Sequence, residues 1–334
     1  MAATEYEIGI LCALALEATA VAGFFDEIYE HNFCKAPSDK LSYTTGKIGR
    51  HEVVLGHMPG IGKVHAAQSA ESLLATFDNL KLVLLVGICG GVPSPTMALG
   101  DVVIGKTVVQ NDFGRQRPDR FETKKGVEDS LGRQRSEIRA FVRKLESCKA
   151  KLSETTRQRL ATLLEKPEFQ QSRYPGIAAD RLFLPDYVHQ HHGAANCECA
   201  YSIKACEDAS TASCEELECD GTKLMPRDLS SRASQGPNIH FGSIASGDMV
   251  MRSGEHRNKS AKEHVVIAFE MEGAGIWDAL PCVIIKGVCD YADSHKDKHW
   301  QRYAAAAAAA CTVAAMEEWI CRSCKATSTL SPLL

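Results

Sequence analysis

The amino-acid sequence predicts an α/β fold built in layers. Aliphatic and β-branched runs alternate along the chain with longer segments of helical spacing, which is the pattern of an α/β domain. Two runs, Leu80–Ile88 and Cys282–Asp290, are apolar at nearly every position, as expected for strands that are buried on both faces. Strands and helices that alternate in this way predict a sheet covered by helices.

The N-terminal elements follow from local patterns. Apolar runs predict strands, Gly49-Arg50 predicts the turn of a hairpin, and residues 59–62 predict a turn before an amphipathic helix. Residues 99–109 are rich in β-branched side chains. The expected strands are Tyr6–Cys12, Tyr43–Ile48, Glu52–His57, Leu80–Ile88 with Gly90-Gly91 as the turn after it, and Leu99–Val109; the expected helices are Glu17–Phe25 and Lys63–Phe77.

The C-terminal part repeats the alternation. Residues 136–165 predict one or two helices, and the alanines near the end of the chain strongly favour a terminal helix. The expected strands are Ile239–Ser246, Val265–Phe269 and Cys282–Asp290, and the expected helices are Glu272–Ala279 and Arg302–Trp319.

We expect a single catalytic domain over residues 5–320, a cysteine-rich insertion within it at 168–237, and a flexible tail at 321–334. The insertion has many polar residues and few periodic apolar ones. Its cysteines and histidines could build a zinc site, but the one close pair, Cys197-x-Cys199, is shorter than the usual C-x₂₋₄-C spacing. We therefore expect free thiols and no metal; the residues concerned are Cys197, Cys199, Cys206, Cys214, Cys219, His189, His191 and His192.

Composition excludes several classes of protein. The chain has 334 residues, 45% of them hydrophobic, and a formal net charge of −4, which does not fit the basic footprint of a nucleic-acid-binding domain. No run reaches the ~18 apolar residues that span a bilayer. The N-terminus has an acidic flank and a short apolar run, unlike a signal peptide. We expect a cytoplasmic protein with reduced cysteines, no membrane partner and no nucleic-acid partner.

Carboxylates follow several expected strands. In open α/β sheets, ligands gather at the carboxyl ends of the strands. Glu17 follows the first strand, Glu270 and Glu272 follow another, and Asp290 ends an apolar strand. Cleavage of a glycosidic bond commonly needs an acid and a base around an oxocarbenium-like centre, and these residues could supply both.

Each carboxylate also has a simpler interpretation. Asp290 could be a general acid, since burial raises the pKa of a carboxyl group, or it could be a helix N-cap. Glu17 and Glu272 could equally be glutamates in a first helical turn. The glycines at 90 and 91 allow close approach of a ligand, but a tight turn explains them as well.

Five segments in order, EIGILCALALEA, LVGICGGV, IASGDMVM, FEMEGAG and GVCDYAD, resemble the nucleoside phosphorylase and nucleosidase superfamily. The resemblance covers about residues 5–115 and 238–320, and the fungal "purine and uridine phosphorylase" branch is the most similar. It implies a three-layer α/β/α fold around a mixed, partly barrel-like sheet. It also implies a homo-oligomer, with a dimer favoured, and no cofactor or metal.

The resemblance also implies roles for individual residues. Asp290 matches the acid that protonates N7 of the leaving purine, and Glu272 matches the glutamate that binds the ribose hydroxyls. Met271 would pack beside the sugar, Phe269 would border the base, and the Gly90-Gly91 turn would line the pocket. Val250-Met251 stands where the nucleosidases have a Phe-Ile pair that stacks on the base, so stacking must come from elsewhere, such as Phe269.

The superfamily contains phosphorylases and hydrolases, and two positions distinguish them. Phosphorylases have phosphate-binding arginines early in the chain and just before the Val-Gly of the glycine turn, where this chain has Leu85. Glu17 matches the glutamate that activates water in the methylthioadenosine and adenosylhomocysteine nucleosidases, and a carboxylate repels phosphate. We therefore expect hydrolysis.

The expected substrate is a purine nucleoside, because no thioether pocket is recognisable. An aspartate at 290 suits adenosine, without excluding inosine or guanosine. Two alternatives stay open: a phosphate-dependent purine nucleoside phosphorylase, or a defence module that cleaves or senses ATP and other nucleotides. Arg115 and Arg117 could reach a 5′-phosphate, or they are solvated loop charges.

Overall fold

The computed structural model describes residues 2–30, 33–192, 197–201, 206–229 and 236–320. The predicted tail at 321–334 lies outside these residues. Within them, no helix is both long enough and apolar enough to cross a membrane.

A nine-stranded mixed sheet forms the centre of the molecule, with strand order β10-β9-β6-β11-β5-β1-β4-β3-β2. Its strands are β1 (Ile8–Cys12), β2 (Glu27–Ile28), β3 (Ser42–Ile48), β4 (His51–His57), β5 (Leu82–Gly91), β6 (Val102–Gln110), β9 (Ile239–Ser246), β10 (Val266–Glu270) and β11 (Cys282–Asp290). Strands β4, β1, β5 and β11 run parallel to one another, whereas β6 is antiparallel to β11. An additional pairing of β10 with β5 closes one half of the sheet into a barrel.

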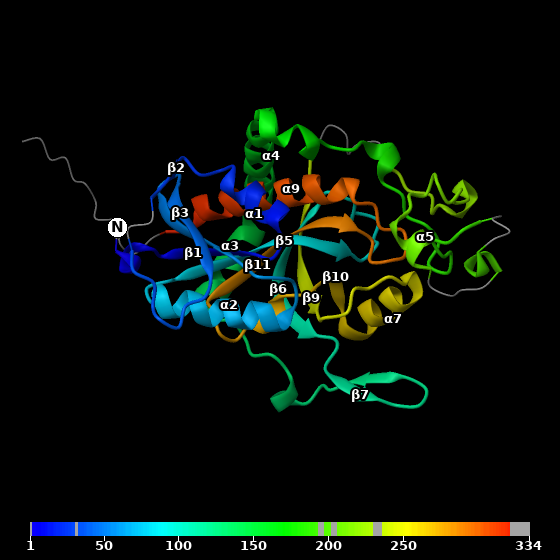
Figure 1. The fold of residues 1–334 in the computed structure, drawn as a ribbon, viewed down its shortest axis with the longest axis horizontal. Helices are drawn as coiled ribbons and strands as arrows, with labels where there is room; N and C mark the ends of the chain where they lie inside the picture. The colour runs from blue at the N-terminus through cyan, green and yellow to red at the C-terminus, as the bar shows by residue number, and fades with distance from the viewer. Residues whose placement is uncertain (1, 31–32, 193–196, 202–205, 230–235, 321–334) are drawn as a thin grey trace, which may run out of the picture.

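Helices cover both faces of the sheet (Figure 1). The long helix α9 packs on β11 and β5 and contacts α1 and α4, while α2 packs on α8. The helices are α1 (Ala15–Ala22), α2 (Lys63–Thr76), α3 (Ser136–Ser147), α4 (Lys149–Glu165), α5 (Glu207–Thr211), α7 (Gly254–His264), α8 (Gly273–Ile276) and α9 (His299–Glu318). The predicted three-layer α/β/α fold with a partly closed sheet is confirmed.

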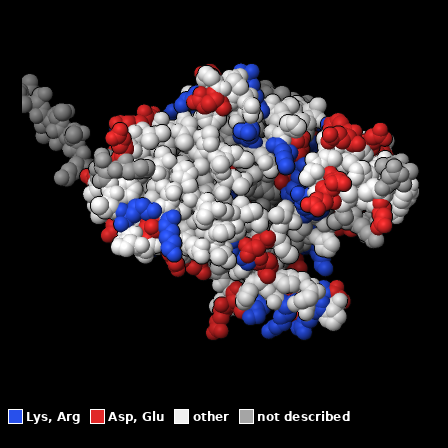
Figure 2. All heavy atoms as spheres, viewed as in Figure 1, with Lys and Arg blue, Asp and Glu red and all other residues white. Residues whose placement is uncertain are grey.

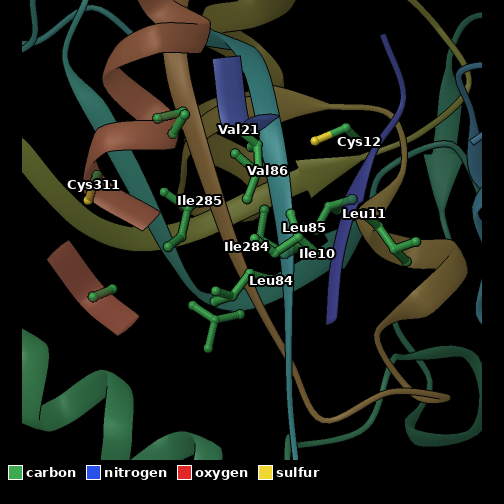
Figure 3. Close-up of a cluster of buried hydrophobic side chains, with 14 of the residues drawn as sticks. Ile10, Leu11, Cys12, Val21, Leu84, Leu85, Val86, Ile284, Ile285 and Cys311 are labelled. Atoms are coloured by element: carbon green, nitrogen blue, oxygen red, sulfur yellow. The ribbon is translucent and has the colours of Figure 1, made fainter. Parts of the chain in front are cut away.

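The core includes the space between α9 and the sheet and continues under α2 and α3. Residues 304–310 of α9 are consecutive alanines, and all are buried, so the helix axis can approach the sheet closely. Figure 3 shows Leu85 and Ile284 of neighbouring strands within this apolar cluster. Burial of such side chains stabilises the fold by about 1.5–3 kcal/mol each.

Several predictions need correction. Gly90 and Gly91 are the last residues of β5 and not a turn, because β10 pairs with both and β11 pairs with Gly90. The predicted helix Glu272–Ala279 is the short α8, Gly273–Ile276. The sequence patterns also missed α7 and a two-stranded sheet of β7 (Gly114–Gln116) and β8 (Phe121–Thr123).

The closure of the mixed sheet also decides how the carboxylates come together. Strand β10 is antiparallel to β5, and the two strands overlap only where Phe269 faces Gly90 and Ala268 faces Gly91. Their carboxyl ends therefore meet because the sheet closes and the strands cross. This closure, and not a common sheet edge, brings Glu270 and Glu272 to the end of β5.

Candidate active site

A cavity of about 260 Å³ lies where β5, β10 and β11 end. Most of the residues expected at the site line this cavity; they are Glu17, Gly90, Val250, Phe269, Met271, Glu272 and Asp290. Gly91 is not among the lining residues, and a side chain there would meet Val288 inside the barrel. Val250 is 51% exposed, so it lies at the open side of the cavity.

Glu17 is fixed by the backbone on three sides. Its Oε2 accepts hydrogen bonds from the amides of Ala13 and Leu14, at 3.0 and 2.9 Å, and its Oε1 accepts one from Ile88 at 2.9 Å. Gly87 leaves room for the carboxylate, since a Cβ there would lie 2.4 Å from Oε1. Burial raises the pKa of Glu17, and the charge of Lys286 and the backbone hydrogen bonds offset only part of that rise. A carboxylate held in this way suits a general base.

Near Glu17, the residues Glu270, Glu272 and Lys286 form a buried cluster of charged side chains. Lys286 extends from the apolar strand β11, and its Nζ is 2.8 Å from Oε2 of Glu272 and 3.4 Å from Oε2 of Glu270. Burial alone would raise the pKa of Glu272, but Lys286 outweighs it and the pKa is lowered. For Glu270, burial dominates and the pKa is raised. Glu272 therefore stays ionised and can accept hydrogen bonds from hydroxyl groups of a ligand in the cavity.

Lys286→Met should destabilise the protein by about 3–5 kcal/mol, because two buried glutamates lose their cation. This loss of unfolding free energy should be smaller near pH 5 than near pH 8. Without Lys286, burial raises the pKa values of Glu270 and Glu272, so the folded variant binds more protons than the unfolded chain. Its stability therefore increases as the pH falls. Urea unfolding at both pH values measures this effect, with the exposed Lys259→Met as the matched control. A deficit that is the same at both pH values would contradict this account of the cluster.

Asp290 lies at the end of β11 with both oxygens engaged. Its Oδ1 accepts a hydrogen bond from the amide of Ala292 at 2.8 Å, and its Oδ2 lies 2.9 Å from Nζ of Lys296. Asp290 is the last strand residue and precedes no helix directly, so the helix N-cap interpretation does not apply. Gly90 is required beside it, because a Cβ there would lie 2.8 Å from Cβ of Ala292 and 2.9 Å from Oδ1 of Asp290.

Sequence patterns missed three basic residues around these carboxylates. Lys286 could have been noticed as the single charge within an apolar strand. Lys296 and Arg252 line the cavity but lie in irregular segments, where no spacing rule marks them. Of the three, Lys296 contacts Asp290 directly.

The two arginines considered for a 5′-phosphate belong to the β7–β8 hairpin, which projects from the body of the molecule (Figure 1). Basic side chains gather on this hairpin in Figure 2, and Arg117 pairs there with Glu122. Neither arginine lines the cavity. Leu85 is fully buried in the core, so no phosphate group can reach its side chain.

The match to a family of known chemistry and the likeness to curated nucleosidases indicate the class of the protein, a nucleoside N-glycosyl hydrolase or phosphorylase. The chain belongs to the phosphorylase superfamily, whose sequence pattern matches residues 7–318.

The relatives with similar sequences include an NLR-like protein and several nucleosidases. A nucleotide-binding leucine-rich repeat (NLR)-like protein of Hyaloscypha variabilis is 30% identical over 93% of this chain, and the chain spans only 29% of its length. A 5′-methylthioadenosine/S-adenosylhomocysteine nucleosidase of Mycobacterium bovis is 22% identical over 90% of this chain and 92% of its own. The solved 5′-methylthioadenosine/S-adenosylhomocysteine nucleosidase of Helicobacter pylori, in complex with a substituted pyrrolidinol, shares the fold with a TM-score of 0.56 and 16% identity, over 94% of this chain and 99% of its own.

Proposed function

We propose that the protein is a purine nucleoside N-ribohydrolase that releases a free base and ribose, with adenosine as the favoured nucleoside. The observation that carries the proposal is the cavity that brings together the backbone-held Glu17, the ionised Glu272 and the Lys296-paired Asp290. These groups supply a base, a sugar-binding carboxylate and a proton donor. Hydrolysis of an N-glycosidic bond requires all three functions.

In the proposed reaction, Glu272 holds the ribose hydroxyls and Met271 packs beside the sugar. Glu17 accepts a proton from a water molecule as the water oxygen bonds to the anomeric carbon. The bond from that carbon to the purine nitrogen breaks, and its electron pair moves to the base. Asp290 delivers a proton to N7, and Lys296 holds the side chain of Asp290 in place. After the products leave, Glu17 returns its proton to solvent water and Asp290 takes one up from solvent water, which restores both groups.

Water is favoured over phosphate as the nucleophile on charge grounds. Glu17, Glu270 and Glu272 all line the cavity, and the buried Lys286 is already paired with two of them. A phosphate beside Glu17 would therefore meet like charge. The alternative is phosphorolysis, and an assay of the sugar product distinguishes the two reactions, because phosphorolysis gives ribose 1-phosphate and hydrolysis gives free ribose.

A nucleotide substrate is a second candidate. The NLR-like relative supports a role in a defence module that cleaves or senses nucleotides, and Arg252 at the cavity supplies a cation for a phosphate group. Glu17, Glu272 and Asp290 are all present, which favours cleavage over sensing alone. With such a substrate the base is still the leaving group and the sugar product becomes a ribose phosphate, so the chemistry at the anomeric carbon is unchanged.

Base release identifies the substrate. Purified protein is incubated with adenosine, inosine and ATP in phosphate-free buffer, and free base is quantified by chromatography. We expect adenine from adenosine, with ribose as the second product. Adenine from ATP alone would favour the nucleotide candidate, and binding of any of the three without base release would contradict the enzymatic function.

A further inference from the structure

A cluster of cysteine and histidine side chains in the insertion lies outside the cavity. The four atoms concerned, Sγ of Cys197, Cys199 and Cys206 and Nδ1 of His191, all lie within 4.8 Å of one another. Spacing in the sequence alone led us to expect free thiols here. The fold instead brings together four residues that lie up to 15 positions apart.

The four ligand atoms are close enough to share one metal ion, and the two contacts of the Cys206 Sγ atom, with Cys197 and with His191, have the spacing of zinc ligands. Cys197 and Cys206 are 3.7 Å apart at Sγ, and Nδ1 of His191 is 3.2 Å from Sγ of Cys199 and 3.8 Å from Sγ of Cys206. Ligand atoms of a tetrahedral zinc ion, with Zn–S of about 2.3 Å and Zn–N of about 2.0 Å, are roughly 3.5–3.8 Å apart. The Sγ atoms of Cys197 and Cys199, at 3.1 Å, are too far apart for a disulfide of about 2.05 Å. Three thiolates and one imidazole are a common ligand set for structural zinc.

A second group of the same chemistry lies nearby, formed by His189, Cys214 and Cys219. Nδ1 of His189 is 3.4 Å from Sγ of Cys219 and 3.8 Å from Sγ of Cys214. The opposite ring nitrogen, Nε2, donates a hydrogen bond to the carbonyl of Ala212 at 2.9 Å. That bond leaves Nδ1 as the lone-pair nitrogen facing the thiols, as outer hydrogen bonds do at metal-binding histidines.

The insertion also needs a source of stability other than an apolar core. Among its described residues from 186 to 220, the buried apolar side chains are Cys199, Ala209 and Leu217. Its helical elements there are single turns of four or five residues. Small segments with so few buried side chains usually depend on disulfides or metals.

We propose that the insertion is a zinc-binding module, with one ion held by His191, Cys197, Cys199 and Cys206 and a second held by His189, Cys214 and Cys219. The module supports the loop that follows Asp290. The amide of His189 donates to Oγ of Ser294 at 3.0 Å, and the ring of His295 stacks on Phe183 with centroids 4.0 Å apart. Lys296, which pairs with Asp290, is the next residue of that loop.

Metal content tests the proposal directly. The full chain, purified with added zinc and a phosphine reductant and without chelator, should contain about two zinc ions by mass spectrometry. Cys199→Ser and Cys219→Ser should each lose one ion and keep the other. Cys34→Ser, an exposed cysteine outside both groups, should keep both. Zinc that is absent from the wild type, or a full two ions retained in both site variants, would overturn the proposal; loss in Cys199→Ser alone would overturn the second site.

Cobalt replacement provides a readout that does not depend on variants that fold poorly. Cobalt(II) added to the zinc-free wild type should give thiolate-to-metal charge-transfer absorption, and its absence would overturn thiolate ligation. The effect on the active site rests on the proposed function: zinc-free protein should lose base-release activity and regain it when zinc is restored. Failure of zinc binding and failure of catalysis are thus measured separately.

Discussion

Asp290→Asn should lower kcat for base release by about 10²–10⁴-fold, the usual contribution of a general acid. The amide keeps the size of the side chain and can still accept the hydrogen bond from Ala292 at Oδ1, but it has no proton to give to N7. Binding of the nucleoside should change little, because the proton is transferred only as the glycosidic bond breaks. Single-turnover kinetics and equilibrium binding of adenosine measure the two effects separately.

Asp297→Asn is the matched control for Asp290→Asn. Asp297 lies on the same loop, is largely solvent-accessible and pairs with His299 away from the cavity. It should leave kcat unchanged. A wild-type kcat in Asp290→Asn would move the acid to another residue, whereas equal losses in both variants would indicate that the loop, and not the carboxyl group, is responsible.

Glu17→Gln should lower hydrolysis by about 10²–10⁴-fold, because an amide cannot take the proton of the attacking water. The variant should also remove the acidic limb of the pH profile. In the wild type, activity should fall as pH decreases through the pKa of Glu17, which burial holds above the ordinary value of 4.5. The limb should therefore lie at a higher pH than that of an exposed glutamate, and kcat/KM measured against pH locates it.

Stability must be checked in Glu17→Gln. The two oxygens of Glu17 accept three backbone amides, and an NH₂ group in place of one oxygen leaves at least one donor unpaired, at a cost of about 1–3 kcal/mol. Thermal unfolding shows whether the variant is folded at the assay temperature. Glu71→Gln on the exposed side of α2 is the control for the substitution itself. A folded Glu17→Gln protein with an unchanged acidic limb would exclude Glu17 as the base.

Much of the fold could be predicted from periodicity. Strands β9 and β11 begin and end at the predicted residues, and β11 in particular is an apolar run with clear ends. The hairpin β7–β8 was missed because its residues are polar and its pairing is short. Helix α7 was missed because it is strongly polar and has few buried residues, so no apolar stripe marks it.

The acidic residues of the site could be found from sequence, but their arrangement could not. Glu17, Glu272 and Asp290 stand at strand ends and in recognisable motifs. Their meeting depends on the crossing of β10 and β5, which no local pattern encodes. Lys286 pairs with Glu272, which lies 14 residues earlier in the chain, and Lys296 pairs with Asp290, which lies 6 residues earlier. The closed sheet creates the first contact and the folded loop creates the second.

The insertion shows the same limit. Cys197-x-Cys199 does not have the spacing of a usual zinc motif, and the histidines nearby alternate between two groups, so neither group is recognisable along the chain. Spacing rules are derived from ligands on regular hairpins and helices. Ligands on irregular loops escape them.

The identity of the nucleophile tests the central claim most directly. The protein is given adenosine in oxygen-18-labelled water that contains unlabelled phosphate, and the sugar product is analysed by mass spectrometry. We predict free ribose with the label at its anomeric oxygen. Unlabelled ribose 1-phosphate as the product would contradict hydrolysis and show that phosphate, despite the carboxylates around it, enters beside Glu17.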